Sequence, residues 1–546
     1  MGTTASRALP QLNARLNLAV RGAAVVAVLF AEKALLNLFV DFQAAQTAQG
    51  FGALVRIGQH WGFRFAVTLA AALALFCYVR DDSGLREINA EARGAPLRIR
   101  QLLAHFVLVL PLAPLSFLLY RRASPLPFPA IVALWLAFAF AALIALLLAA
   151  APWDLWRRAA RATGVLWIYA GAAAVAAASA MEWSQQLWGP TAGVTFALVR
   201  DVLAPFIPSL QADPAARVLS TNRFAIEVAP ICSGLEGMGL MFAFCCAWLL
   251  YFRKEYIFPR ALILVPAGLL LIFGLNVLRI ATLMAIGYAG YPSVAVYGFH
   301  SQAGWIAFNV AAGGIAYSTR RSRWLNRSAR TESHSASADN PTAAYLIPFL
   351  AILATGMLAR AISSGFETLY ILRFIAAAIA LRVYCARIKA LDWRFSWRAP
   401  LLGIAVFGVW IVGAHFALDS HSMPAALAAM SPATRALWIG GRILASVSTV
   451  PVAEELAYRG YLMRRVLAAD FESVPFMTVG LVPVLVSAAV FGITEGSLWL
   501  PGFIAGVMFA VILIRTGRFG EAVAAHATTN GLIAAWVLLA NQWQLW

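Results

Sequence analysis

Charged residues are scarce in this chain of 546 residues, of which 12% are Asp, Glu, Lys or Arg and 62% are hydrophobic. Soluble domains carry about 25% charged residues, so the composition excludes a soluble protein of this size. Long apolar runs recur from end to end, each near the ~20 residues that a helix needs to cross a bilayer. We therefore expect an all-α, polytopic transmembrane helical bundle with roughly fifteen spans and the lipid bilayer as its surroundings.

Cysteine is also scarce, with five residues and no paired spacing of the kind that binds zinc. Cys77, Cys245 and Cys246 fall in or beside apolar runs, where a thiol usually behaves as a small buried hydrophobe. Cys385 falls in a basic loop. Only Cys232 falls in a segment expected outside the membrane, which makes it a candidate reactive thiol. Nothing in these spacings indicates a metal or a cofactor.

Acidic residues are outnumbered, 24 against 42 Lys and Arg, and the net charge is +18. The basic residues are scattered through short loops without interleaved aromatics, which excludes a nucleic-acid surface. Basic loops face the cytoplasm. With the N-terminus inside, the basic loops 80–100, 153–161, 253–254 and 320–330 all fall inside, and only Arg121 with Arg122 breaks the rule. This topology places the segment 182–235 and His300 outside, and Arg279 in the outer half of a span.

A polar tract rich in Ser and Arg at 320–341 separates two apolar blocks and is typical of a linker. We therefore predict four parts, which are an N-terminal anchor region (1–60), a first membrane module (61–318), a cytoplasmic linker (319–342) and a second membrane module (343–546). The expected spans lie near 18–40, 63–79, 103–120, 127–150, 164–181, 236–252, 260–287, 303–318, 343–361, 368–384, 399–418, 434–450, 475–493, 497–514 and 522–540.

The first module brings a thiol, a guanidinium and an imidazole to one predicted membrane face. A thiolate attacks carbonyls, an imidazole moves its proton, and an arginine stabilises an oxyanion. Cys232, Arg279 and His300 are therefore candidate catalytic residues. Because an arginine within a span is costly, Arg279 is a functional candidate by default. The alternative is that it pairs with a helix C-terminus or a nearby carboxylate.

The second module contains Glu454 and Glu455, with Arg459 one helical turn after Glu455. His526 and Asn530 likewise share one helical face. One carboxylate with a raised proton affinity can act as a general base toward water while Arg459 holds the other. The alternative is a structural ion pair between Glu455 and Arg459 near the cytoplasmic interface. The spacings do not match a zinc signature such as HExxH.

The segments 229–234 (Ala-Pro-Ile-Cys-Ser-Gly), 276–279 (Asn-Val-Leu-Arg) and 298–300 (Gly-Phe-His) resemble the exosortases. The resemblance covers roughly residues 60–320. It implies a bacterial inner-membrane cysteine protease and transpeptidase that processes C-terminal sorting signals of exported proteins. Cys232 would be the nucleophile, Arg279 the transition-state stabiliser and His300 the acid and base.

Residues 343–546 resemble the CAAX-protease and bacteriocin-processing (CPBP) family of intramembrane proteases. The family patterns EExxxR and HxxxN match Glu454, Glu455, Arg459, His526 and Asn530 and imply a glutamate-dependent site. The middle pattern FxxxH departs, because Glu495 stands where the family has histidine. Hydropathy alone also sets Glu495 at the opposite membrane end from His526.

The combination resembles the exosortase E/protease fusions, whose targets bear a VPEID-type C-terminal signal. It implies a multi-pass protein of the bacterial inner membrane with the exosortase site facing the periplasm, no cofactor and exported proteins as substrates. Two other interpretations remain open. In a transporter or polymer-export protein, Arg279 and Glu454 would line a polar path and Cys232→Ser would be tolerated. Alternatively, the second module is a noncatalytic scaffold.

Overall fold

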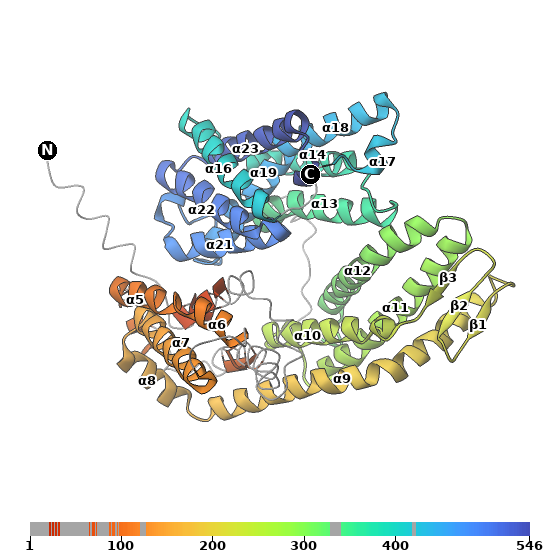
Figure 1. The fold of residues 1–546 in the computed structure, drawn as a ribbon, viewed down its shortest axis with the longest axis horizontal. Coiled ribbons are helices and arrows are strands. Elements are labelled where there is room, and N and C mark those ends of the chain that lie inside the picture. The colour runs from red at the N-terminus through yellow and green to blue at the C-terminus, as the bar shows by residue number, and fades with distance from the viewer. Residues whose placement is uncertain are drawn as a thin grey trace. The chain divides into compact units, whose positions relative to one another are not determined.

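A computed structural model describes residues 98–120, 127–327, 340–417 and 422–546, with scattered residues between 21 and 96. Almost all described elements are helices, so the predicted polytopic helical fold is confirmed (Figure 1). The chain divides into two compact units, Met1–Gln186 and Leu187–Trp546. The expected spans at 18–40 and 63–79 fall largely outside the described residues, as does Cys77.

Among the described residues from Arg98 onward, the first unit contains four complete helices and the start of a fifth. The helix pair α8 and α9 bends by 79° at its break. The buried polar side chains of this unit include His105. His105 lies 2.6 Å from the carboxylate of Glu32 and 2.9 Å from the carbonyl oxygen of Ala142, which satisfies both ring nitrogens. The helices are α5 Ile99–Val109, α6 Leu112–Tyr120, α7 Phe128–Ala150, α8 Trp153–Thr163 and α9 Leu166–Leu203.

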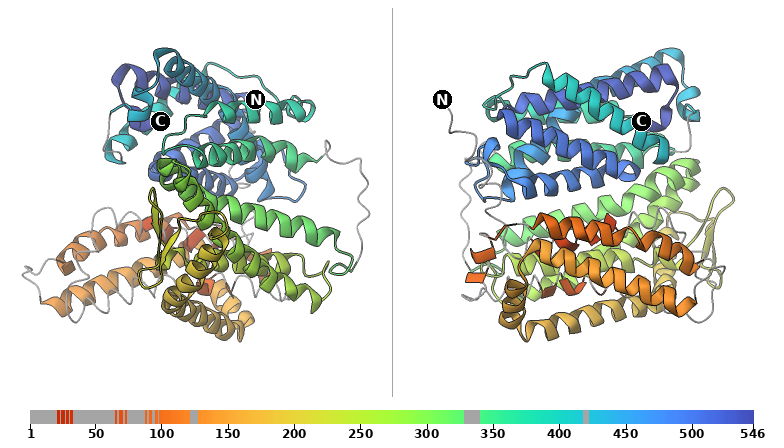
Figure 2. Two further views of the ribbon diagram at one scale, coloured as in Figure 1. Left: turned by 90° about the vertical axis from the view of Figure 1, so that its right-hand side faces the viewer. Right: turned by 60° about the vertical axis from the view of Figure 1, so that its left-hand side comes forward.

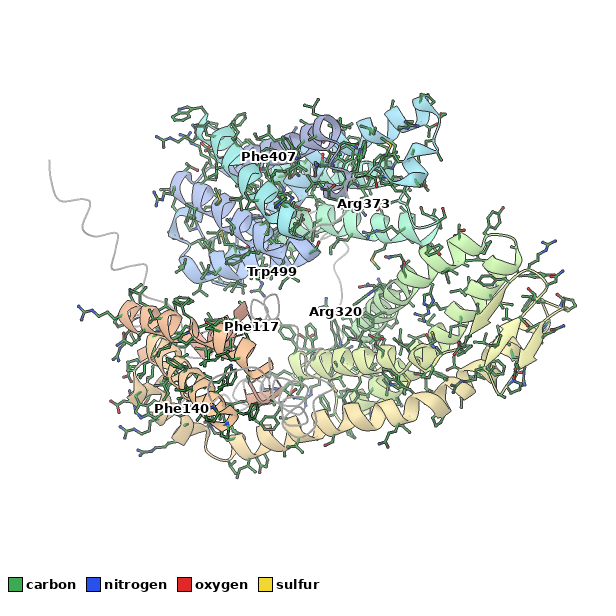
Figure 3. All side chains as sticks on the ribbon, in the orientation of Figure 1. Phe117, Phe140, Arg320, Arg373, Phe407 and Trp499 are labelled. Atoms are coloured by element: carbon green, nitrogen blue, oxygen red, sulfur yellow. The ribbon has the colours of Figure 1, made fainter. Side chains whose placement is uncertain are left out.

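Eight helical segments in the described part are long and apolar enough to cross a membrane, or nine if the bent pair is one span. Two expected spans are shorter in the structure, since α14 and α21 have 13 and 14 residues, whereas α10 has the expected 17. The expected span 434–450 instead belongs to a helical segment that continues to Arg465. Apolar side chains point outward, as membrane helices require (Figure 3), including Phe140 with 66% of its surface exposed.

The segment expected as an outer loop, 182–235, begins with a helix because α9 continues to Leu203. A small antiparallel sheet in the order β1-β2-β3 follows, with Leu219 opposite Ala212 on one side and Ile226 on the other. Figure 2 shows this sheet as a narrow ribbon beyond the end of α9. Leu219 is fully buried and ties the sheet to the helices beneath it. The strands are β1 Gln211–Asp213, β2 Val218–Ser220 and β3 Ala225–Glu227.

Three helices and three short turns follow in the first half of the second unit. A buried cluster that includes Phe196, Val277, Ile280 and Met284 packs α9 against α11 beneath the sheet. Cys232 borders this cluster. The elements are the 3-10 turn η4 Pro230–Ser233, α10 Leu235–Tyr251, the 3-10 turn η5 Arg260–Ile263, α11 Leu264–Tyr288, the π-helical turn η6 Val294–Phe299 and α12 His300–Arg321.

Residues 341–546 form a helical bundle whose main core includes Leu456, Phe491, Phe509 and Phe519. Two pairs of helices pack extensively, α21 on α22 and α16 on α23. The longer elements are α13 Pro341–Ala361, α14 Ile371–Val383, α16 Arg398–Ala417, α18 Pro432–Val447, α19 Thr449–Glu455, the π-helix η7 Leu456–Leu462, α21 Leu481–Thr494, α22 Trp499–Thr516 and α23 Phe519–Ala540. The short ones are α15 Cys385–Ile388, α17 Ala425–Ala428, α20 Met463–Arg465, η8 Phe476–Thr478, η9 Gly496–Leu498 and η10 Trp543–Leu545.

Candidate catalytic sites

The turn that carries Cys232 is held by side chains from two neighbouring helices. Pro230 is among the first residues of the 3-10 turn η4, and Gly234 ends it with a left-handed backbone (φ 89°) from which α10 starts. Asn276 of α11 donates to the carbonyl of Cys232 at 3.0 Å, and Thr195 of α9 donates to that of Ser233, also at 3.0 Å. Both carbonyls of the turn are therefore fixed, which sets the direction of the thiol.

Arg279 is the charged group common to this site. Its positive charge acts on both Cys232 and His300. A Cβ at position 304 would lie 2.9 Å from Nη1 of Arg279, so Gly304, one turn after His300 on α12, leaves room for the guanidinium. The guanidinium of Arg279 is thus close enough to Cys232 and to His300 for its charge to act on both. No hydrogen bond or ion pair joins Arg279 to another described residue, although the negative charge of Glu236 also acts on it.

Burial and charge set the protonation of the thiol and the imidazole. Burial raises the pKa of the half-buried Cys232 thiol above its ordinary value, and the positive charge of Arg279 only partly opposes this shift. Desolvation of the His300 ring lowers its pKa, and Arg279 lowers it further. Both shifts favour a neutral thiol and a neutral imidazole at neutral pH over a thiolate and an imidazolium.

Glu454, Glu455 and Arg459 of the second group lie within the helical segment Pro432–Arg465, and His526 lies on α23. Nη1 of Arg459 lies 3.1 Å from Oε1 of Glu455, and both side chains are completely buried. Nδ1 of His526 lies 2.9 Å from the same carboxylate oxygen. Glu455 therefore joins Arg459 of the π-helix η7 to His526 of α23. The ion pair weighed as the structural alternative exists, but it also positions the histidine.

Aromatic rings fix the plane of the imidazole. The ring of His526 stacks on Phe509 at 4.9 Å and meets Phe491 edge to face at 5.8 Å. The guanidinium of Arg459 lies 4.6 Å from the ring centre of Phe491 and donates to the carbonyl of Gly506 at 3.2 Å. The aromatic contacts hold the ring of His526, and its Nδ1 contacts Glu455. Nε2 therefore faces Glu454, whose Oε2 lies 3.6 Å from it.

The π-helix η7 has a supporting contact that the sequence did not suggest. A π-helix changes the backbone hydrogen-bond pattern, and such turns frequently occur at functional sites. The hydroxyl of Ser487 on α21 donates to the carbonyl of Tyr458 at 2.8 Å. Asn530 donates to the carbonyl of Ser446 at 2.9 Å and ties α23 to α18. These contacts stabilise the turn on which Arg459 lies and the helix that carries His526.

Glu454, Glu495, His526 and Asn530 all line one cavity of about 170 Å³. The prediction that Glu495 and His526 lie at opposite membrane ends is therefore wrong. Hydropathy fixes span ends only, whereas Glu495 follows the short helix α21 and His526 lies two turns inside α23. Gly502 permits the approach, because a Cβ there would lie 2.8 Å from Cγ of Glu495. No cluster of metal-binding side chains occurs among the described residues.

Sequence reasoning assigned no role to three residues that shape these sites. Asn276 lies three residues before Arg279, and this helical spacing could have indicated a shared face. Arg442 lines the cavity of the second site. A lone arginine inside the predicted span 434–450 was an available signal. Thr195 carried no sequence signal, because its helix was expected to be a loop.

Comparison with known families agrees with the motifs. Residues 65–317 match the transmembrane exosortase family. Residues 436–532 match the family of type II CAAX prenyl endopeptidase Rce1-like proteins. No curated protein and no solved structure matches the chain. The two family segments carry the two groups of side chains described above, so the chain is a membrane-spanning fusion of an exosortase with a CPBP-type, Rce1-like protease.

Proposed function

We propose that the exosortase segment is a cysteine peptidase and transpeptidase that cuts exported proteins near a C-terminal sorting signal. The observation that carries this proposal is the charge of Arg279 acting on both Cys232 and His300. Its substrates would be exported proteins that bear a VPEID-type signal. Its site would face the periplasm from the bacterial inner membrane.

The first reaction follows from the neutral ground state. His300 takes the proton from the Cys232 thiol as sulfur attacks the scissile carbonyl. Arg279 faces the oxyanion that develops, because its Nε is buried and has no hydrogen-bond partner among the described residues. The imidazolium then gives its proton to the leaving amine as the C–N bond breaks. An amine or water resolves the thioester and returns the thiol.

The Rce1-like segment would hydrolyse a peptide bond within the membrane. Glu454 faces the cavity with 16% of its side chain exposed, whereas Glu455 has none exposed. Glu454 takes a proton from water as the oxygen attacks the carbonyl carbon, and then passes it to the leaving amine. Nε2 of His526 faces the same space and, when it carries a proton as well as Nδ1, can donate a hydrogen bond to the oxyanion. Glu495 supplies a second carboxyl group in place of the family's histidine.

Mass spectrometry of a co-expressed exported reporter with a C-terminal apolar helix tests both activities. Four strains are compared, which carry the wild type, Cys232→Ala, Glu454→Gln and the double variant. We expect Cys232→Ala to abolish cleavage and acceptor attachment at the sorting signal, and Glu454→Gln to abolish a separate cut. Normal processing by inserted Cys232→Ala protein would overturn the first assignment. A transporter would tolerate Cys232→Ala and Cys232→Ser, and a scaffold would tolerate Glu454→Gln.

A further inference from the structure

The cavity of the Rce1-like segment contains an arginine that the proposed chemistry does not use. Arg442 of α18 lines the same cavity as Glu454 and His526. It forms no hydrogen bond and no ion pair with any residue in the described part of the chain. An arginine in an apolar bundle usually has a carboxylate or carbonyl partner, because an uncompensated charge there is costly. Its free donors therefore need an explanation.

Aromatic rings hold the guanidinium in place. The carbon centre of the Arg442 guanidinium lies 4.4 Å from the ring of Tyr370, 5.3 Å from that of Trp546 and 5.6 Å from that of Trp438. Cation–π contacts stabilise a guanidinium through its face and leave the N–H groups at its edge free to bind an anion. The arrangement orients Arg442 without using up its donors.

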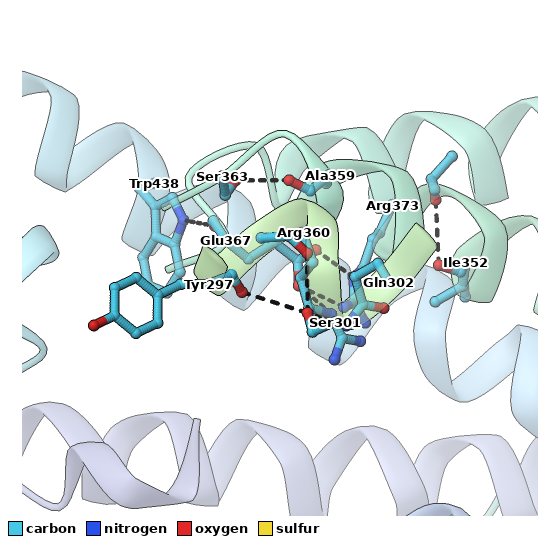
Figure 4. Close-up of polar contacts among 12 residues, drawn as sticks. Tyr297, Ser301, Gln302, Ile352, Ala359, Arg360, Ser363, Glu367, Arg373 and Trp438 are labelled. Carbon is cyan, nitrogen blue, oxygen red and sulfur yellow. Dashed lines mark hydrogen bonds and ion pairs between the residues drawn. The ribbon is translucent and has the colours of Figure 1, made fainter. Parts of the chain in front are cut away.

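The surroundings of Arg442 carry surplus positive charge. Arg373 and Arg360 repel it, and Glu367 is the carboxylate that attracts it. Figure 4 shows Glu367 together with Arg360 and Arg373. Arg373 already occupies both oxygens of Glu367 at 2.6 Å, and Arg360 reaches the same carboxylate at 3.4 Å. Glu367 therefore pairs with two arginines and leaves Arg442 without an ion-pair partner among the described residues. A Cβ at Gly356 would lie 2.6 Å from the Arg373 guanidinium, so the glycine leaves room for this arrangement.

The carboxylates elsewhere in the cavity do not neutralise this charge. Glu495, Glu455, Arg459 and, most weakly, Arg373 act on Glu454, whereas Arg442 is not among the charges that act on it. The cavity thus has an acidic part, where water would be activated, and a cationic part around Arg442. An anionic group on a substrate would be repelled by the first and attracted by the second, which fixes its direction in the cavity.

We propose that Arg442 forms a carboxylate-binding subsite that orients the peptide substrate of the Rce1-like site. The ligand is a peptide with a carboxylate near the scissile bond, from its C-terminus or from an Asp or Glu side chain. The guanidinium edge of Arg442 binds this carboxylate while the neighbouring bond lies at Glu454. This inference rests on the proposed proteolytic function of the same cavity.

The test measures binding to the Glu454→Gln protein in nanodiscs, which separates recognition from catalysis. The probes are three fluorescent apolar decapeptides of one sequence, one with a free C-terminal carboxylate, one with a C-terminal amide, and one amidated with a single internal Glu. Arg442→Gln is added to this background. Arg398→Gln, which removes an exposed arginine outside the cavity, is the matched charge control, and Arg442→Lys retains the charge.

We expect at least one carboxylate probe to bind more tightly than the neutral amide. Arg442→Gln should raise the Kd of that probe by about 10- to 100-fold, the factor for losing one charge-assisted hydrogen bond. It should leave the Kd of the amide unchanged. Arg398→Gln should behave as its parent, and Arg442→Lys should be intermediate. The preferred probe tells whether the carboxylate is terminal or on a side chain.

Equal binding of all three probes, or an equal loss for all three in Arg442→Gln, would overturn the subsite. Unfolding temperatures of the variants identify any loss that comes from misfolding, and Arg442→Lys then decides the case because it keeps the cation. Absence of any Glu454-dependent cleavage in the reporter experiment would instead remove the proteolytic function. A carboxylate preference in the binding assay would persist in that case, so the two failures are distinguishable.

Discussion

His526 lies 2.9 Å through Nδ1 from Oε1 of Glu455, a carboxylate with no exposed surface. This contact divides the work between the two consecutive glutamates. Glu455 holds the imidazole and Arg459, whereas Glu454 faces the cavity and the other ring nitrogen. Adjacent residues on one helix thus have different functions because a helix turns about 100° per residue.

Glu455→Gln should therefore mainly lower the stability of the protein, and Glu454→Gln should mainly lower its activity. Removing the charge of Glu455 leaves Arg459 buried without its ion pair, which costs about 3–5 kcal/mol of unfolding free energy. Glu454→Gln should keep the unfolding midpoint near that of the wild type and lower kcat by about 10²- to 10⁴-fold, the range for one acid–base group. Thermal unfolding in detergent and cleavage of the reporter measure the two effects. Loss of stability in Glu454→Gln with a stable Glu455→Gln would contradict this division.

Glu495 should act in the chemistry and not only fill space. It lines the cavity with Glu454, and the two carboxylates repel each other. We expect Glu495→Gln, which has the same shape, to lower kcat by about 10²-fold with little change in KM. Glu495→His places the family's residue there and should retain more activity than Glu495→Gln. Wild-type kcat in Glu495→Gln would show that this position takes no part in proton transfer.

Much of the first site could be predicted, because the order of spans and the basic loops together place Cys232, Arg279 and His300 on one side. The supporting contacts could not. Thr195 lies on an extension of α9 that hydropathy assigns to a loop, although the helix continues well beyond its apolar half. Hydropathy marks where a chain leaves the membrane and not where a helix ends.

The second site shows a different limit. Periodicity places Glu455 and Arg459 on one face of a regular helix, and they do meet. Packing between distant segments decides two further features. These are the π-helical turn that begins at Leu456 and the position of Glu495 and His526 around one cavity. Arg442 has no motif at all, and only the cavity reveals its use.

Arg279→Gln should raise the pKa of both Cys232 and His300. The charge of Arg279 now lowers the pKa of both Cys232 and His300, so removing it should raise both. The pH profile of Cys232 alkylation by iodoacetamide, measured on the peptide that contains it, should move to higher pH because only the thiolate reacts. The acid limb of processing activity should also move to higher pH, since His300 must be neutral to accept the proton.

Arg279→Lys keeps the charge and is the control for this pair of shifts. It should leave both pH profiles near those of the wild type while it lowers the rate, because an ammonium lacks the fork of donors of a guanidinium. For Arg279→Gln we expect a loss of about 10²- to 10³-fold in kcat, as for removal of one oxyanion donor. An alkylation profile that stays in place in Arg279→Gln would show that this charge does not reach the thiol.

Gly234→Ala should misplace Cys232 without touching the thiol itself. Position 234 has φ 89°, and an added Cβ would lie 2.9 Å from Nδ2 of Asn276, the atom that donates to the Cys232 carbonyl. A left-handed backbone costs an L-residue about 1–2 kcal/mol, and the clash adds to it. Because small misplacement of a nucleophile is expensive, processing should fall by about 10²-fold.

Gly239→Ala on the same helix is the matched control, because its added Cβ would meet nothing within 4 Å. This variant should process the reporter as the wild type does and should be slightly more stable, since alanine favours a helix. Asn276→Ala in the Gly234→Ala background relieves the clash but also removes the donor, so it should not restore activity. Full activity of the double variant would mean that steric contact with Asn276, and not the position of the Cys232 carbonyl, limits the reaction.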